Sequence, residues 1–268
     1  MIAMHFESRS LAAELGRYAE DYASLMQKEA AALVHLAQQL RREGWASTTS
    51  MFPTPLLDRL TTEITSLVSE ERGGTRHLFE LPLIQDLARS KPVREIAESV
   101  LGPDCFAVRG ILFDKTPTAN WKVVWHQDLS VAVCERRDVD GFGPWSVKEG
   151  VPHVQPPVEI LERMLAVRIH LDDCELENGL VRVIPGSHRE GRLSASAIDA
   201  WRLEHSAIDC VVPRGGILAF FPLLLHASSA SQRPQHRRVI HLEFAASDLP
   251  SGLKWYYSIS QHRLADSA

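Results

Sequence analysis

The sequence predicts a mainly β domain of the sandwich or jelly-roll type, with helices at its N-terminal end. Helical periodicity is confined to the segment 1–104. From residue 105 to residue 246, short apolar runs alternate with turn signals, as they do in sandwiches and jelly rolls. The chain has 268 residues, which suits a single domain of this architecture.

The first expected helix covers residues 9–43. Its apolar residues recur at steps of three and four and form one stripe: Met26, Ala30, Leu33, Leu36, Ala37 and Leu40. Gly44 is a suitable helix stop. We expect the stripe to cover the core of the domain, because most amphipathic helices do so; a dimer contact is the alternative.

A second helix is expected over residues 90–101. Pro92 near its start and Gly102 just past its end follow the usual preferences of helix termini. The side chains expected on its buried face are Val93, Ile96, Val100 and Leu101.

After Gly102 the periodicity changes to that of strands. The expected strands cover residues 105–113, 123–133, 164–171, 180–184, 208–212, 217–225 and 238–244. Turn signals between them include Glu177-Asn178-Gly179, Pro185-Gly186 and Arg214-Gly215-Gly216. We therefore expect one domain over residues 1–268, with mainly helical support in 1–104 and a β core in 105–246.

The segment 136–158 does not show the strand pattern. It is long and rich in Gly and Pro, and ordered loops of this kind often cover binding sites. We expect a lid-like insertion, with an ordinary surface insertion as the alternative. Trp145, His153 and Gln155 are its candidate substrate contacts, unless they only pack within the loop.

Composition excludes several classes of function. The net charge is −5 and the basic residues are scattered, so the nucleic-acid footprint of clustered Lys and Arg is missing. Four widely spaced cysteines without a C-x-x-C pair indicate reduced thiols rather than disulfides or a zinc site. With neither a signal-peptide pattern nor an apolar run of membrane length, we expect a cytoplasmic protein that acts on a small molecule.

Candidate metal ligands come from the pattern H-x-D/E, in which alternate residues of a strand face one ion. Two histidines and one carboxylate are the usual ligands of non-haem Fe(II) oxygenases. Twelve histidines and 34 acidic residues in 268 predict roughly 1.5 chance matches. The chain has five: His5-Phe6-Glu7, His126-Gln127-Asp128, His170-Leu171-Asp172, His188-Arg189-Glu190 and His241-Leu242-Glu243.

Chain order narrows the choice, because the third ligand must be a later histidine on a neighbouring strand. His226 closes the apolar run 217–226 and meets this need. Spacing then favours His126 and Asp128, but the strand 164–172 leaves His170 and Asp172 as a serious competing pair. Of the other matches, His5 is near the N-terminus and His188 lies in an expected turn. His241 has only one later histidine, His262.

The position of Arg237 relative to His226 suggests a residue that binds a co-substrate. Arg237 lies one hairpin after His226, and a buried arginine can bind a carboxylate through two parallel hydrogen bonds. Arg237 and Arg238 point to opposite faces at the start of the strand 238–244. The apolar face of this strand, on the side of Arg238, should pack under the helices. We therefore expect Arg237 to point into the domain and bind the distal carboxylate of 2-oxoglutarate.

Four segments together resemble the phytanoyl-CoA dioxygenase family. They are FDKTP (113–117), WHQDLSVAV (125–133), RIHLDDCELENGLVRVIPGSH (168–188) and HASSASQRPQHRRVIHLEF (226–244). The resemblance implies a double-stranded β-helix (a cupin-like jelly roll) with the N-terminal helices packed outside. It also implies that His126, Asp128 and His226 bind iron, and that Arg237, Ser228 and Arg168 contact 2-oxoglutarate.

By this resemblance the chain is an Fe(II)- and 2-oxoglutarate-dependent dioxygenase that uses O2 to hydroxylate a small molecule, releasing succinate and CO2. Asp128 favours hydroxylation or desaturation over halogenation, which needs a small residue at that position. The alternatives are a non-catalytic cupin-like binding protein and a metal-dependent isomerase on the same barrel. The 136–158 insertion departs from better-known members, so an acyl-CoA substrate does not carry over; the oligomeric state stays open.

Overall fold

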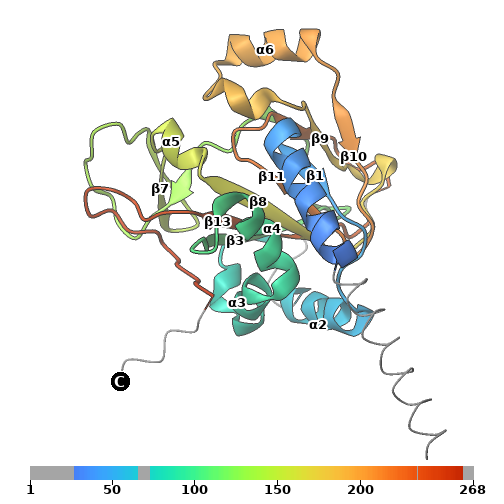
Figure 1. The fold of residues 1–268 in the computed structure, drawn as a ribbon. Helices are drawn as coiled ribbons and strands as arrows, with labels where there is room; N and C mark the ends of the chain where they lie inside the picture. Colours follow the sequence, from blue (N-terminus) through green and yellow to red (C-terminus); the bar gives the residue numbers. More distant parts are fainter. Residues whose placement is uncertain (1–26, 66–72, 234, 262–268) are drawn as a thin grey trace, which may run out of the picture.

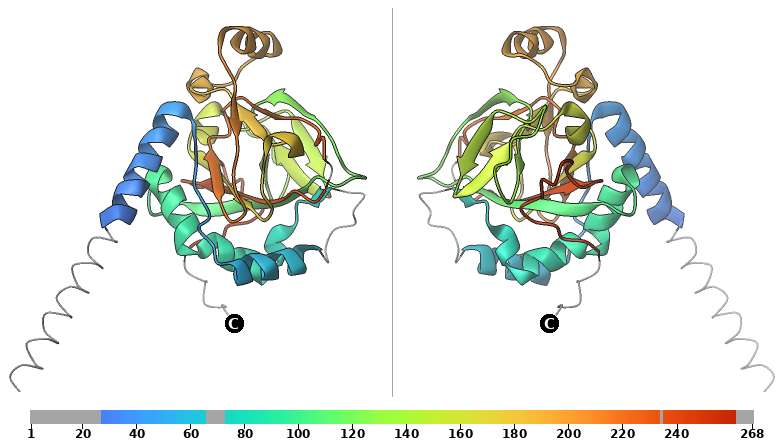
Figure 2. Two further views of the ribbon diagram at one scale, coloured as in Figure 1. Left: turned by 90° about the vertical axis from the view of Figure 1, so that its right-hand side faces the viewer. Right: turned by 90° about the vertical axis from the view of Figure 1, so that its left-hand side faces the viewer.

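Two β-sheets face each other and helices cover the outside of the larger one (Figures 1 and 2). The structure is a computed structural model that describes residues 27–65, 73–233 and 235–261. This arrangement is the double-stranded β-helix that the sequence and its family resemblance predict. Within the described ranges, no helix is both long and apolar enough to cross a membrane.

The larger sheet has six strands, and its neighbouring strands are antiparallel. In spatial order they are β1 (Trp45–Ser47), β11 (Ile217–Phe220), β8 (Met164–His170), β13 (Arg238–Ala245), β3 (Phe106–Asp114) and β2 (Gly74–Thr75). The smaller sheet contains β10 (Ile208–Cys210), β9 (Val181–Val183), β12 (His226–Ser228) and β4 (Val123–His126). A third sheet contains β5 (Val131–Ala132), β7 (Val151–Val154) and β6 (Trp145–Lys148).

The helices follow the prediction in part. They are residues 27–43, α2 (Thr54–Thr65), α3 (Pro82–Arg89), α4 (Lys91–Leu101), α5 (Val158–Leu161) and α6 (Ala195–Glu204), with short 3-10 turns η1 (Leu78–Glu80), η2 (Leu176–Asn178) and η3 (Ser187–Glu190). The helices over 27–43 and 91–101 confirm the second expected helix and the described part of the first, whose residues 9–26, Met26 included, lie outside the described residues. Helix α6 stands apart on the side away from α2–α4 (Figure 2).

Helix 27–43 packs by its predicted stripe only toward its C-terminal end. Leu36, Ala37 and Leu40 are buried, whereas Ala30 is exposed. Gly44 ends the helix with a φ of +86°, and its N–H donates to the Leu40 carbonyl at 2.8 Å. The stripe therefore covers the core where the helix meets the sheet, as expected.

Strand alternation in β13 separates the apolar core from the polar interior. Ile240, Leu242 and Phe244 belong to the apolar cluster that packs the larger sheet against the helices. His241 and Glu243 point the other way and line a cavity between the sheets. The prediction that the apolar face of this strand packs under the helices is confirmed.

The segment 136–158 contains regular structure that its sequence pattern did not predict. Strands β6 and β7 form an antiparallel hairpin, with Lys148 paired to Val151 across the turn. The two turn residues, Glu149 and Gly150, have φ values of +49° and +80°, as a tight two-residue hairpin turn requires. The expectation that this segment contains no strands is therefore wrong.

Candidate metal and co-substrate site

A cavity of about 510 Å³ lies between the two sheets. Its wall is built by β3, β8 and β13 of the larger sheet, β4 and β12 of the smaller sheet, and β6 of the hairpin. Polar and charged side chains from all these strands point into it, although apolar clusters fill the space around it. Burying so many polar groups is costly unless they serve ligands, so the cavity is the candidate functional site.

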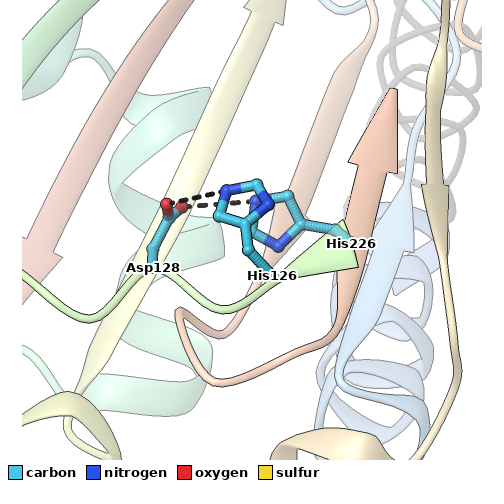
Figure 3. A group of neighbouring side chains, drawn as sticks. All are labelled: His126, Asp128 and His226. Carbon is cyan, nitrogen blue, oxygen red and sulfur yellow. Dashed lines mark ion pairs between the residues drawn. The ribbon is translucent and has the colours of Figure 1, made fainter. Parts of the chain in front are cut away.

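His126, Asp128 and His226 come together at the wall of this cavity (Figure 3). His126 on β4 is the direct register partner of His226 on β12. Asp128 follows β4, and its two carboxylate oxygens lie 3.5 Å from Nε2 of His126 and 3.5 Å from Nε2 of His226. All three potential ligand atoms lie within 4.8 Å of one another.

Both imidazole rings are oriented by the backbone of their own strands. Nδ1 of His126 lies 2.8 Å from the Val124 carbonyl, and Nδ1 of His226 lies 2.9 Å from the Leu224 carbonyl. Each Nδ1 must donate to its carbonyl, which leaves Nε2 with its lone pair directed at the common centre. Such hydrogen bonds behind a histidine are the usual support of a metal ligand.

The protonation states of these groups suit a cation. Burial lowers the pKa of His226 to about 4, although the nearby Asp128 carboxylate favours the protonated ring. Burial by itself raises the pKa of Asp128, but the neighbouring His226 and His126 outweigh it and hold the pKa well below its usual range. Imidazole nitrogens and an ionised carboxylate, all on one side of an open cavity, fit the facial ligand set of non-haem Fe(II).

The competing pair does not form such a site. Asp172 accepts two hydrogen bonds from the Arg238 side chain, at 2.8 and 2.6 Å. His170 is fully buried, and neither of its ring nitrogens has a hydrogen-bond partner among the described residues. The geometry therefore separates His126 and Asp128 from His170 and Asp172, which spacing alone did not.

A second group of possible ligands, Asp128, His241 and Glu243, lies beside the first. Nε2 of His241 is 3.1 Å from the Glu243 carboxylate, which also forms a close ion pair with Arg109. Since Glu243 already neutralises Arg109, it is a poorer donor to a cation than Asp128.

Three cationic side chains gather at one end of the cavity. Arg237 donates from Nη1 to the Gly179 carbonyl at 2.7 Å, and Lys115 donates to Ser228 Oγ at 2.8 Å. Nη1 of Arg168 lies 3.3 Å from Nδ1 of His241. The structure thus brings together the predicted residues Arg237, Ser228 and Arg168.

The charges at this end are incompletely compensated. The Nε atoms of Arg168 and Arg237 are buried and have no hydrogen-bond partner in the described part of the chain. Burial and the nearby charge of Arg237 lower the pKa of Lys115 to about 7 and that of Arg168 to about 10. A carboxylate bound among these groups would supply the missing acceptors and charge.

Lys115 was missed as a site residue by sequence reasoning. It lies directly after β3 and is fully buried, although lysine is almost never fully buried without a partner. The available signal was its position at the end of the apolar run 111–113, inside the FDKTP segment.

The three candidate substrate residues are placed differently. Trp145 and Gln155 line the cavity. His153 is buried in the hairpin and is not among the lining residues; its Nδ1 lies 2.9 Å from the Val151 carbonyl. The structure therefore brings two of the three to the site.

Two further residues of the motifs hold the loops around the ligands. Gln127 donates from Nε2 to the Gly191 and Leu223 carbonyls, at 2.8 and 2.7 Å. Ser187 Oγ accepts from the Leu225 amide at 2.9 Å, directly before His226. Both side chains fix the backbone next to a proposed ligand.

Known proteins support this assignment of fold and family. A sequence model of the family described as phytanoyl-CoA dioxygenase matches residues 61–239, which is more than half of the chain. The dioxygenase lolE1 of Epichloe uncinata is 27% identical over 177 residues, covering 60% of this chain and 62% of that protein. The matched region therefore spans less than two thirds of this relative.

Solved structures share the fold at low sequence identity. EctD from S. alaskensis, crystallised with 2-oxoglutarate and 5-hydroxyectoine, has a TM-score of 0.61 at 19% identity over 78% of this chain and 74% of that chain. The epimerase SnoN, in complex with Fe3+, alpha ketoglutarate and nogalamycin RO, has a TM-score of 0.63 at 15% identity over 87% and 96%. The sequence match over residues 61–239 and the shared fold show that this chain belongs to the phytanoyl-CoA dioxygenase family.

Proposed function

We propose that this chain hydroxylates a small molecule, with His126, Asp128 and His226 holding Fe(II), and with 2-oxoglutarate and O2 as co-substrates. The phytanoyl-CoA dioxygenase family consists of Fe(II)- and 2-oxoglutarate-dependent oxygenases, which sets the general reaction class. The observation that carries the proposal is the convergence of three metal-binding side chains beside a buried group of cations.

Each part of the cavity has a separate task. When bound, iron and 2-oxoglutarate supply the oxidising chemistry with O2, and the co-substrate leaves as succinate and CO2. Arg237, Lys115 and Arg168 bind and orient the distal carboxylate, and Ser228 fixes the ammonium group of Lys115. Nδ1 of each ligand histidine keeps its proton because it donates to a backbone carbonyl, so that Nε2 remains available.

The hairpin β6–β7 is the proposed lid. Its tip is held against the segment after β2, where the Arg76 amide donates to the Glu149 carboxylate at 2.9 Å and His77 Nε2 lies 3.2 Å from the Glu149 carbonyl. Trp145 of β6 and Gln155 after β7 face the cavity from this side. The hairpin thereby shields the cavity from water and presents contacts to the substrate.

Hydroxylation is the outcome we favour within this class. Solved structures of the same fold include an epimerase and a carbocyclase, so the fold alone does not choose the outcome. Asp128 occupies a coordination position that a halide would need, which favours hydroxylation over halogenation. The substrate is proposed to be a small molecule, because the candidate ligands line a concave cavity of about 510 Å³.

The direct test is succinate release from 2-oxoglutarate under air, by protein loaded with Fe(II), in the presence of a panel of metabolites. We expect slow uncoupled release from the wild type and faster release with a substrate. His226→Ala should abolish both, and His35→Ala, which changes an exposed histidine, should change neither. Metal binding without any succinate would instead indicate a binding protein, and turnover without O2 an isomerase.

A further inference from the structure

The cavity carries more positive charge than the proposed co-substrates need. Six cationic side chains line it: Arg76, Arg109, Lys115, Lys148, Arg168 and Arg237. Asp128 and Glu243 are the two carboxylates among the lining residues. A ferrous ion and a 2-oxoglutarate dianion cancel each other, so binding of both leaves the excess of cations unchanged. A surplus that survives cofactor binding points to a second anion.

The cations form two separate groups. Lys115, Arg168 and Arg237 lie at the proposed co-substrate end, and the proposed function already assigns them to the carboxylate of 2-oxoglutarate. Arg76, Arg109 and Lys148 form the other group, which we call the outer cation cluster. Burial lowers the pKa of Lys148, and the charges of Arg109 and Arg76 lower it further, as expected for cations held close together.

Three different parts of the fold bring the outer cation cluster together. Arg109 is in the middle of β3, and Arg76 directly follows β2. Lys148 is the last residue of β6 in the hairpin insertion. Because like charges repel, the fold keeps these residues together against a cost that a bound anion would remove.

Arg109 has hydrogen-bond donors to spare. Its side chain is only 6% exposed, and Nη2 forms an ion pair with Glu243. Its Nε and Nη1 atoms are buried and have no partner among the described residues. Buried guanidinium donors without acceptors are costly, and an oxyanion is their natural ligand.

The other two cations are held in place without being neutralised by a close carboxylate. Lys148 Nζ donates to Ser130 Oγ at 2.8 Å, which is a neutral partner. Arg76 Nε lies 3.5 Å from Glu149, and both side chains of this pair are partly exposed, so the ion pair is weak. Arg109 therefore offers unpaired donors, and Arg76 and Lys148 offer charge, to a ligand in the cavity.

We propose that Arg76, Arg109 and Lys148 form a subsite for an anionic group of the primary substrate, a carboxylate or a phosphate. This inference rests on the proposed function and deepens it by naming the substrate class. Asp128 lines the same cavity as Arg76, Arg109 and Lys148, so the subsite shares this cavity with the proposed iron ligands. The hairpin insertion contributes to specificity through Lys148.

The subsite is tested by binding before turnover. Protein loaded with redox-inert Zn(II) and saturating 2-oxoglutarate is titrated, without oxygen, with matched pairs of probes. These are benzoate against benzamide, phenyl phosphate against phenol, and hexanoate against hexanamide. Intrinsic fluorescence reports binding, because Trp121 and Trp145 line the cavity. Saturating 2-oxoglutarate keeps the probes out of the co-substrate end.

We expect at least one anion to bind roughly ten-fold tighter than its neutral partner, which corresponds to one charge-assisted contact. Lys148→Gln should remove that preference, and Arg109→Lys, which keeps the charge for Glu243 but removes spare donors, should weaken it. Lys254→Gln alters an exposed lysine away from the cavity and should leave it intact. Whether carboxylates or phosphates are preferred identifies the kind of anion.

Equal binding of anions and neutral partners, or no binding by any anion, would overturn the subsite. A preference that survives in Lys148→Gln would overturn it as well. Succinate release by the iron-loaded protein is measured on the same preparation. If succinate forms but neutral compounds stimulate it best, the subsite is wrong and the oxygenase function stands. If 2-oxoglutarate neither binds nor is consumed, the proposed function itself fails.

Discussion

Asp128 is the residue on which the proposed metal site depends most, because its carboxylate lies 3.5 Å from Nε2 of both imidazoles. Asp128→Asn keeps the shape of the side chain and removes its charge. We expect Co(II) affinity, measured by calorimetry as a stand-in for Fe(II), to fall by roughly 100-fold or more. Asp104→Asn, which changes an exposed aspartate, is the matched control and should bind as the wild type does.

Lys115 gives the co-substrate site a pH dependence. Its pKa of about 7 means that the ammonium group loses its proton as the pH rises through neutrality. We expect the KM for 2-oxoglutarate to increase between pH 6 and pH 8 in the wild type. Lys115→Met should raise the KM by roughly ten-fold at pH 6 and flatten the pH dependence. A KM with the same pH profile in both proteins would show that Lys115 does not bind the co-substrate.

His153 makes the stability of the protein depend on pH. Burial lowers its pKa to about 4 in the folded protein, whereas an unfolded histidine titrates near 6.5. The unfolded state therefore binds the extra proton between these values, and stability falls as the pH falls through that window. The shift corresponds to up to about 3 kcal/mol at pH 4.

The comparison that checks this uses His153→Gln, which cannot take up a proton. Urea unfolding of the wild type and the variant should show a smaller loss of unfolding free energy between pH 6.5 and pH 4 in the variant. Parallel pH profiles would mean that His153 is solvated in the folded protein.

At the scale of the elements, strand alternation was the most reliable guide. The pattern in 238–244 placed Ile240 and Leu242 toward the helices and His241 and Glu243 toward the cavity, and the structure agrees. Runs of apolar residues were less informative where the chain changes sheet. The run 217–225 was expected as one strand, but β11 ends at Phe220, and residues 221–225, of which 222–225 are buried, turn toward β12.

Two of the elements that the sequence did not predict, α6 and the β6–β7 hairpin, lack the patterns on which their prediction depends. Helix α6 has no buried residue, so it has no apolar stripe to detect. The β6–β7 hairpin turns at Glu149-Gly150 rather than at the more familiar Asn-Gly or Asp-Gly pair.

The contact between β13 and the helices can be tested by removing buried volume. Leu242 is fully buried in the apolar cluster, whereas Leu203 on α6 is 89% exposed. We expect Leu242→Ala to lower the unfolding free energy by about 2–5 kcal/mol and Leu203→Ala to change it little. Chemical denaturation measures both, and equal effects would contradict the assigned packing.

At the scale of the whole molecule, the site depends on contacts between distant parts of the chain. His126 and His226 are neighbours only because β4 pairs with β12. Spacing could propose both residues but left His170 in competition, since sequence shows which residues share a strand face but not which faces meet. The outer cation cluster was not predicted at all, because Arg76, Arg109 and Lys148 come from segments with no common pattern.

The carboxylate of Asp128 at the proposed iron site also leads us to predict which product the reaction forms. With a carboxylate in the ligand set, we expect substrate-stimulated succinate release to proceed equally with and without chloride. Product mass should increase by one oxygen atom. A chlorinated product, or a requirement for chloride, would contradict the assignment of Asp128 as an iron ligand.

The most direct test of the proposed iron site is an equilibrium titration of the protein with Fe(II) in the absence of oxygen, with and without 2-oxoglutarate. We predict that one Fe(II) binds per chain and binds more tightly when 2-oxoglutarate is present. Binding should be lost in His226→Ala and retained in His35→Ala. Iron that does not bind, or that binds equally well to His226→Ala, would contradict the proposed iron site.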